Sequence, residues 1–204
     1  KIDVYSPSHN ELNICNNKQL KYVLKNGDFT HVIHTAIKGR GHYTTEKDSI
    51  IFYENILTQE YLINFNNHYD KLIIFSSGAD YDRKFDIFNR KEGDYRTVPI
   101  DFYGLSKYIN TKRVENNSKI INLRLFNVFG PQERDFRFIK TCIKKCLKNE
   151  EIHIWNDMFF SFFYIEDLFT VINFLIQKSL SNYYELNCVY QETKKLSDIA
   201  NLIK

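Results

Sequence analysis

Leu72-Ile-Ile-Phe-Ser76 is an unbroken apolar run that ends in a small hydroxyl residue. A run of this length without alternation is typical of a strand that is buried on both faces of a parallel sheet. On either side of it, short apolar runs alternate with segments of helical periodicity, which predicts βαβ units, an α/β fold and a mainly parallel sheet. Strands are expected at 2–5, 29–35, 72–76 and 120–125, and helices at 18–25, 50–65, 103–115 and 138–148.

Polar residues follow several of the expected strands. Ser6, Thr35, Ser77 and Asn127 each come at the end of an apolar run or shortly after it. Because ligands of parallel sheets bind at the carboxyl ends of the strands, these side chains are expected to share one ligand-binding edge.

Tyr103-Gly-Leu-Ser-Lys107 places a tyrosine and a lysine four residues apart on one expected helix. Residues at this spacing lie on the same helix face, so the ammonium can help a phenol whose ordinary pKa is about 10 to exchange a proton at neutral pH. A serine at a neighbouring strand end can bind the same substrate oxygen, next to a carbon that gains or loses a hydride. Among 14 tyrosines and 28 lysines and arginines, the spacing also arises by chance or on a solvated helix face.

Composition narrows the class of protein. The 204 residues are 43% hydrophobic and carry a net charge of +3, with no basic run that suggests a nucleic-acid partner. The aromatic stretch 159–163 is far too short to span a membrane. Cys142 and Cys146 are interpreted as core or half-buried thiols, because the four cysteines include no pair with metal-ligand spacing. We therefore expect no bound metal and a reducing, cytoplasmic location.

Three segments occur in a specific order: Ser76-Ser-Gly-Ala-Asp-Tyr81, Pro99-Ile-Asp-Phe-Tyr-Gly-Leu-Ser-Lys107 and Leu123-Arg-Leu-Phe-Asn-Val-Phe-Gly-Pro131. Their order and spacing resemble extended short-chain dehydrogenase/reductases of the NAD-dependent epimerase/dehydratase type that act on nucleotide sugars. Segments 162–168, 184–187 and 196–200 extend the resemblance over nearly the whole chain. Within the family, Ser8-His-Asn-Glu-Leu-Asn13 is most similar to the GDP-fucose synthase type. The resemblance implies a doubly wound Rossmann-type sheet.

The resemblance also implies roles for individual residues. Ser77 would polarise the sugar oxygen, Tyr103 would be the acid/base, and Lys107 would lower the pKa of Tyr103 and bind the nicotinamide ribose. Two of the residues also have a plain structural interpretation. Ser77 would only cap the next segment, and Asn127 would only be a turn residue. Further cofactor contacts are expected from Ser6, Ser8, His9, Thr35, Ala36, Asn55 and Ser76, and substrate contacts from Ala79, Asn127, Arg134 and Arg137.

Departures from the family pattern bear on the reaction. Dehydratases carry Thr-Asp-Glu where this chain has Ser77-Gly-Ala79, so loss of water is not expected. The fucose synthase type epimerises two carbons with a cysteine and a histidine, and here Ala79 and the region of Arg137 stand at those positions. Reduction of a 4-keto-6-deoxy sugar remains the favoured reaction. A 4-epimerase with retained NAD, a reductase of another ketone, and a non-catalytic member that keeps the fold remain alternatives.

Two further departures concern phosphate groups. Many relatives place a basic residue just before the aromatic strand, where this chain has Phe160-Ser161, so contact with the nucleotide diphosphate would shift to Arg134, Arg137 or Lys140. At the end of the second strand, Ser6-Pro-Ser-His9 offers hydroxyls and an imidazole rather than a carboxylate. This favours NADP over NAD, because a carboxylate there would bind the ribose 2′-hydroxyl and repel a 2′-phosphate.

The family's opening strand and Gly-x-x-Gly-x-x-Gly turn are missing from the sequence. That strand would lie in the middle of the sheet, so we expect the native polypeptide to be longer. We further expect residues 1–131 to form an incomplete Rossmann-type cofactor domain, with 132–204 mainly in an interleaved and incomplete substrate lobe. Because relatives pair through the helix that carries the tyrosine and lysine, a homodimer is expected.

Overall fold

A four-stranded parallel sheet forms the centre of the computed structural model, which describes residues 2–38, 47–85, 87–178 and 183–204. Its strands are β1 (His31–His34), β2 (Lys71–Ser77), β3 (Ile120–Leu125) and β7 (Glu185–Cys188), in the order β1-β2-β3-β7. All three neighbouring pairs are parallel. The predicted α/β fold with a parallel sheet is confirmed.

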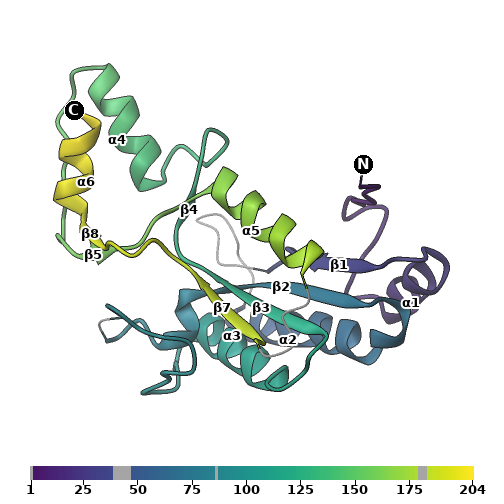
Figure 1. Ribbon diagram of the computed structural model, residues 1–204. Coiled ribbons are helices and arrows are strands. Elements are labelled where there is room, and N and C mark those ends of the chain that lie inside the picture. Colours follow the sequence, from purple (N-terminus) through teal and green to yellow (C-terminus); the bar gives the residue numbers. More distant parts are fainter. Residues whose placement is uncertain (1, 39–46, 86, 179–182) are drawn as a thin grey trace.

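Helices cover both faces of this sheet (Figure 1). Helices α1 (Asn17–Asn26), α2 (Asp48–Asn64) and α3 (Phe102–Arg113) lie on one face, and α5 (Ile165–Gln177) lies on the other. Alternate side chains of β2 therefore enter different cores: Leu72 and Ile74 pack with α1 and α2, whereas Ile73 packs with α5. Burial on both faces explains why the strand is apolar throughout.

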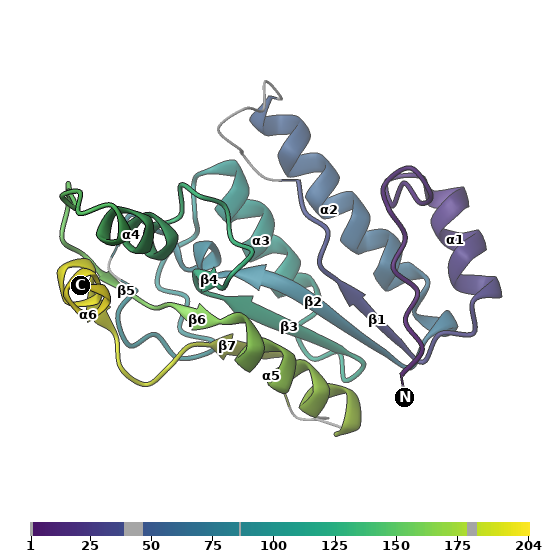
Figure 2. The same cartoon turned by 90° about the horizontal axis from the view of Figure 1, so that it is seen from above.

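A smaller lobe lies beyond the carboxyl ends of the strands (Figures 1 and 2). In it, α4 (Phe138–Leu147) packs against α6 (Leu196–Ile203). Two short strand pairs join the lobe to the sheet: β4 (Val128–Phe129) with β6 (Phe163–Tyr164), and β5 (Phe159–Phe160) with β8 (Lys194–Lys195). Because β7 belongs to the central sheet, the chain passes from the lobe to the sheet and back.

The expected strand at 2–5 is wrong. Residues 2–7 have no regular secondary structure, and Ile2, Val4 and Tyr5 are exposed. A strand needs a neighbour for its backbone groups, and β1, at this edge of the sheet, pairs only with β2 among the described residues. The other expected helices and strands are confirmed with shifts of one or two residues at most of their ends.

Two short 3-10 helices complete the described chain, η1 (Asn66–His68) and η2 (Gly78–Tyr81). The second follows β2 directly and shapes the site below. Within the described residues, no helix combines the length and the apolar character that crossing a membrane requires.

Candidate active site

Ser77 ends β2 and begins the turn that forms η2. Its hydroxyl oxygen accepts a hydrogen bond from the Ala79 amide at 3.2 Å, so the serine does cap the next segment. The same hydroxyl lies near the Tyr103 phenol and acts to lower its pKa. The capping role and the role implied by the family resemblance are thus compatible.

Tyr103 lies in the first turn of α3. The Asp101 carboxylate caps this helix by accepting from the Gly104 amide at 2.9 Å. Burial raises the pKa of Tyr103, while the Ser77 hydroxyl and the Arg83 guanidinium act to lower it. Burial outweighs these two effects, so the phenol keeps its proton at neutral pH, and the lowering by Lys107 that the family resemblance implies stays a prediction.

Lys107 lies one turn further along α3 and is buried. Its ammonium donates to the Phe75 carbonyl oxygen of β2 at 2.8 Å. Burial lowers the pKa of Lys107 to about 8, against the Asp80 carboxylate, which acts to raise it. With a pKa of about 8, the ammonium is still mostly charged at pH 7, although its desolvation is costly.

A cleft of about 960 Å³ opens beside Ser77, between the ends of the strands and the small lobe. Arg83, Arg90, Lys91 and Arg137 line it, and its described lining residues include no Asp or Glu. Aromatic rings contribute apolar walls, among them Phe88 and Phe159, whose ring centroids are 5.5 Å apart. An apolar cleft with several cations suits a ligand that has both an anionic and an uncharged part.

Three of the four residues predicted to bind substrate line this cleft: Ala79, Asn127 and Arg137. Asn127 has a left-handed backbone (φ 36°), and its side-chain amide donates to the Ser161 carbonyl oxygen at 3.1 Å. It therefore also attaches the segment between β5 and β6 to the end of β3. Arg134 is exposed and is not among the lining residues.

Apart from Ser76, Tyr103 and Lys107, the residues predicted to bind the cofactor lie in three places. Thr35 and Ala36 are exposed at the carboxyl end of β1, and Asn55 is buried in α2. The Asn55 amide holds the segment after β1, accepting from Lys38 N at 2.9 Å and donating to Lys38 O at 2.8 Å. The third group, Ser6, Ser8 and His9, is exposed in the segment before α1.

The described residues suit the nicotinamide end of a dinucleotide. Ser76 is buried at the same strand end as Ser77, and its hydroxyl has no hydrogen-bond partner in the described part of the chain. Buried polar atoms are rarely left unpaired, so this hydroxyl is available to a bound polar group. Together with Tyr103 and Lys107, it could hold the carboxamide and ribose of a nicotinamide nucleotide.

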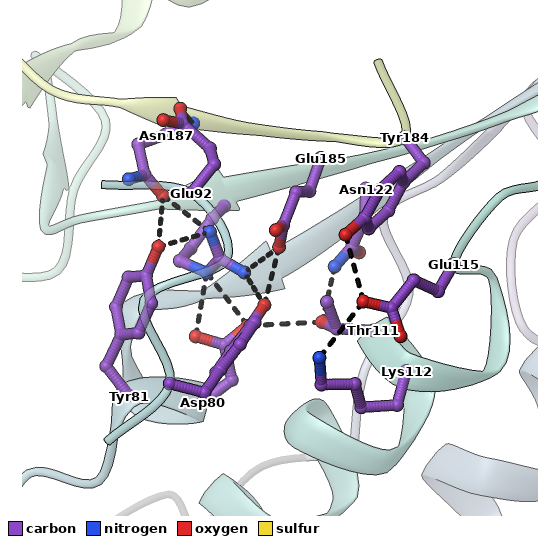
Figure 3. A network of polar contacts seen from close by, with 12 residues as sticks. Asp80, Tyr81, Glu92, Thr111, Lys112, Glu115, Asn122, Tyr184, Glu185 and Asn187 are labelled. Atoms are coloured by element: carbon purple, nitrogen blue, oxygen red, sulfur yellow. Dashed lines mark hydrogen bonds and ion pairs between the residues drawn. The ribbon is translucent and has the colours of Figure 1, made fainter. Parts of the chain in front are cut away.

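The sequence analysis did not predict a buried polar network behind the cleft, whose members include Asp80, Glu185 and Asn187 (Figure 3). Arg124 of β3 is fully buried, and its guanidinium contacts the carboxylates of Asp80 and Glu185 at 2.7 and 2.6 Å. It also donates to the Asn187 side-chain oxygen at 2.6 Å, and Asn187 in turn donates to the Arg90 carbonyl oxygen. The network thereby fixes the turn after β2 and one wall of the cleft.

Arg83 also escaped the sequence analysis. Its guanidinium carbon lies 5.9 Å from the centroid of the Tyr103 ring, and it contacts the Asp101 carboxylate at 2.9 Å. The sequence indication for Arg83 was a cation six residues after Ser77. The sequence indication for the buried network was an arginine inside the apolar strand 120–125, because a buried guanidinium requires a buried partner.

Comparison with known proteins agrees with this fold. Residues 2–187 match the family described as the NAD dependent epimerase/dehydratase family. No curated protein sequence matches the chain.

Solved structures share the fold at low identity. A dTDP-4-dehydrorhamnose reductase from Bacillus anthracis in complex with NADP is 24% identical, with a TM-score of 0.78, and the match covers 98% of this chain and 70% of that one. A GDP-mannoheptose C4 reductase from Campylobacter jejuni with NADP bound is 18% identical, with a TM-score of 0.78, and covers 97% and 73%. The Bordetella bronchiseptica enzyme WbmG in complex with NAD and UDP is 18% identical, with a TM-score of 0.78, and covers 93% and 60%. The chain thus spans 60% to 73% of the length of these structures.

Proposed function

Since the chain belongs to the NAD dependent epimerase/dehydratase family, we propose that it contains the proton-transfer site of an NAD(P)-dependent reductase. The substrate would be a nucleotide-linked 4-keto-6-deoxy sugar. The observation that carries this proposal is the proximity of Tyr103 to Ser77, a residue that lines the cationic cleft.

The proposed reduction needs one hydride and one proton. The nicotinamide cofactor supplies the hydride when it is bound. Ser77 binds the ketone oxygen, and Tyr103 gives its phenolic proton to that oxygen as the carbon–oxygen double bond becomes a single bond. Lys107 stabilises the negative charge left on the phenolate, which then regains a proton from solvent.

The state of the tyrosine supports reduction. A phenol whose pKa is raised by burial holds the proton that a ketone reduction consumes. Dehydration would need an acid or base beside the sugar, and the described residues lining the cleft include no carboxylate. Ala79 occupies the place of the cysteine expected for epimerisation at neighbouring carbons.

Arg137 is our candidate for the nucleotide diphosphate. Its side chain lines the cleft and contacts the Val128 carbonyl oxygen at 3.4 Å, so it is held near the end of β4. A guanidinium can bind two phosphate oxygens at once. Asn127 and Ala79 would contact the sugar between this group and Ser77.

NADP is the proposed cofactor. The hydroxyls of Ser6 and Ser8 and the imidazole of His9 are exposed, and they would tolerate a 2′-phosphate better than a carboxylate would. A homodimer through α2 and α3 is also proposed, because Tyr53 and Phe102 expose apolar surface on these helices (61% and 45%).

The decisive experiment compares wild type and Tyr103→Phe in NADPH oxidation, with and without a 4-keto-6-deoxy nucleotide sugar. Oxidation should require the sugar, and the substitution should slow turnover about 100-fold or more while NADPH still raises the melting temperature. Full activity of the variant would refute the role of Tyr103. Tightly bound NAD after purification, with sugar epimerisation, would favour a 4-epimerase, and no response to NADPH or NADH would favour a non-catalytic protein.

A further inference from the structure

Asp80 is a buried carboxylate that lies outside the cleft. It sits in η2, three residues after Ser77, and its side chain is fully buried. Both of its oxygens accept from Arg124 Nε, at 2.7 and 2.8 Å. Burial raises the pKa of Asp80 against the lowering effect of the Arg124 guanidinium, and the two short contacts to Nε favour the charged form of the carboxyl group.

Asp80 also contacts the helix that carries the proton donor. One oxygen accepts from the Thr111 hydroxyl of α3 at 3.1 Å, a contact that can be followed in Figure 3. Thr111 lies four residues after Lys107, so the two share one face of α3. This face is attached to the end of β2 at two levels, by Lys107 to the Phe75 carbonyl oxygen and by Thr111 to Asp80.

Two titratable groups from other elements act on Lys107. His34 at the end of β1 and the Asp80 carboxylate both interact electrostatically with the ammonium, the imidazole carrying no charge at neutral pH because burial lowers its pKa to about 4. Asp80 faces Arg124 from β3 and Glu185 from β7 behind it. The Asp80 carboxylate therefore acts to raise the pKa of Lys107, against the lowering caused by desolvation.

We propose that Asp80 is a positioning residue for the Tyr103–Lys107 pair: it joins α3 to the end of β2 through Thr111 and presents its negative charge to the Lys107 ammonium. Arg124 holds the carboxylate in this place. The inference deepens the proposed function and rests on it only for the effect on turnover.

The first experiment needs no substrate. The ¹⁵Nζ resonance of Lys107, assigned by its loss in Lys107→Met, is followed against pH by NMR in wild type, Asp80→Asn and Glu185→Gln. Both substitutions remove one carboxylate from Arg124, but only Asp80 acts on Lys107. We expect the midpoint to move to lower pH in Asp80→Asn and to stay in place in Glu185→Gln. An unchanged midpoint in Asp80→Asn, or equal shifts in both variants, overturns the proposal.

A second measurement covers the case that Asp80→Asn does not fold. In wild type, the ¹³C resonance of the Asp80 carboxylate should show a step near pH 8, where Lys107 titrates, and the step should vanish in Lys107→Met. A resonance without this step refutes the electrostatic interaction between Asp80 and Lys107.

Turnover separates this inference from the proposed function. Thr111→Val should lower kcat about tenfold with KM and the alkaline limb of the pH profile unchanged, because the carboxylate remains. Asp80→Asn should move that limb to lower pH, since its charge raises the pKa of both Lys107 and Tyr103. If no variant and no wild type turns over the sugar, the proposed function fails while the NMR result still decides the role of Asp80.

Discussion

The first turn of α3 lies directly on the turn after β2: a Cβ atom on Gly104 would come within 2.7 Å of the Ala79 carbonyl oxygen. The same atom would lie 2.9 Å from an Asp101 carboxylate oxygen. Since Ser77 precedes one of these turns and Tyr103 belongs to the other, this close approach sets the distance between the two proposed catalytic groups.

Gly104→Ala should therefore disturb both stability and chemistry. The added methyl meets backbone rather than a flexible side chain, so α3 must shift. We expect a loss of about 1 to 3 kcal/mol of unfolding free energy, although alanine is the better helix former. Urea unfolding measures this, with Arg113→Ala on the exposed part of the same helix as control. A stabilised Gly104→Ala protein would show that the contact is not tight.

Lys107→Met should stabilise the protein at pH 7. Burial lowers the pKa of Lys107 from 10.5 to about 8, which corresponds to about 3 kcal/mol of cost for the charged form. Loss of the hydrogen bond to Phe75 offsets roughly 1 kcal/mol of that, leaving a gain of about 2 kcal/mol.

The pH dependence of that gain has a defined sign. Below pH 8, Lys107 is charged in both states and the wild type bears the full cost. Between pH 8 and 10.5 the folded state loses its proton first, so wild-type stability rises and the advantage of the variant shrinks. Thermal unfolding at pH 7 and pH 10 measures this, and Lys148→Met, at a side chain 68% exposed, should show no such gain. Lower stability of Lys107→Met at pH 7 would contradict the prediction.

His34 should make the protein sensitive to acid. Burial first, and the Lys107 charge second, lower its pKa to about 4. Above pH 6.5 the imidazole is neutral in both states and contributes nothing. As the pH falls from 6.5 to 4, the unfolded state takes up the proton first, so stability is lost over this range.

His34→Gln should therefore lose less stability than wild type between pH 7 and pH 4.5, as measured by urea unfolding at each pH. His153→Gln, at a side chain 68% exposed, is the control and should follow wild type. Parallel stability curves for wild type and His34→Gln would rule out this role of the imidazole.

Local pattern was enough to predict β2 and the helix that carries Tyr103. Their apolar run and their helical spacing are properties of neighbouring residues. The strand expected at 2–5 failed because strand formation depends on a partner, and α5 (Ile165–Gln177) was not predicted because its β-branched and aromatic residues also suit a strand.

The site was predictable to the same extent. Ser77 and Tyr103 lie near each other because both stand at the ends of predicted elements, and their shared role stays a prediction. Arg83 and Arg90 belong to the irregular segment after η2, whose course depends on contacts with Asn187 more than 90 residues away in sequence. No local pattern contains that information.

Arg137 and Arg134 provide a matched pair for the phosphate contact. Both lie just before α4, but only Arg137 lines the cleft, whereas Arg134 is exposed outside it. If Arg137 binds the diphosphate, Arg137→Ala should raise KM for the nucleotide sugar by about 10-fold to 100-fold, as expected for a lost charge-assisted hydrogen bond, with a smaller effect on kcat. Arg134→Ala should leave KM unchanged. Steady-state kinetics of both variants, supported by calorimetric titration with a nucleoside diphosphate, test this directly, and equal effects of the two substitutions would mean that the phosphates bind elsewhere.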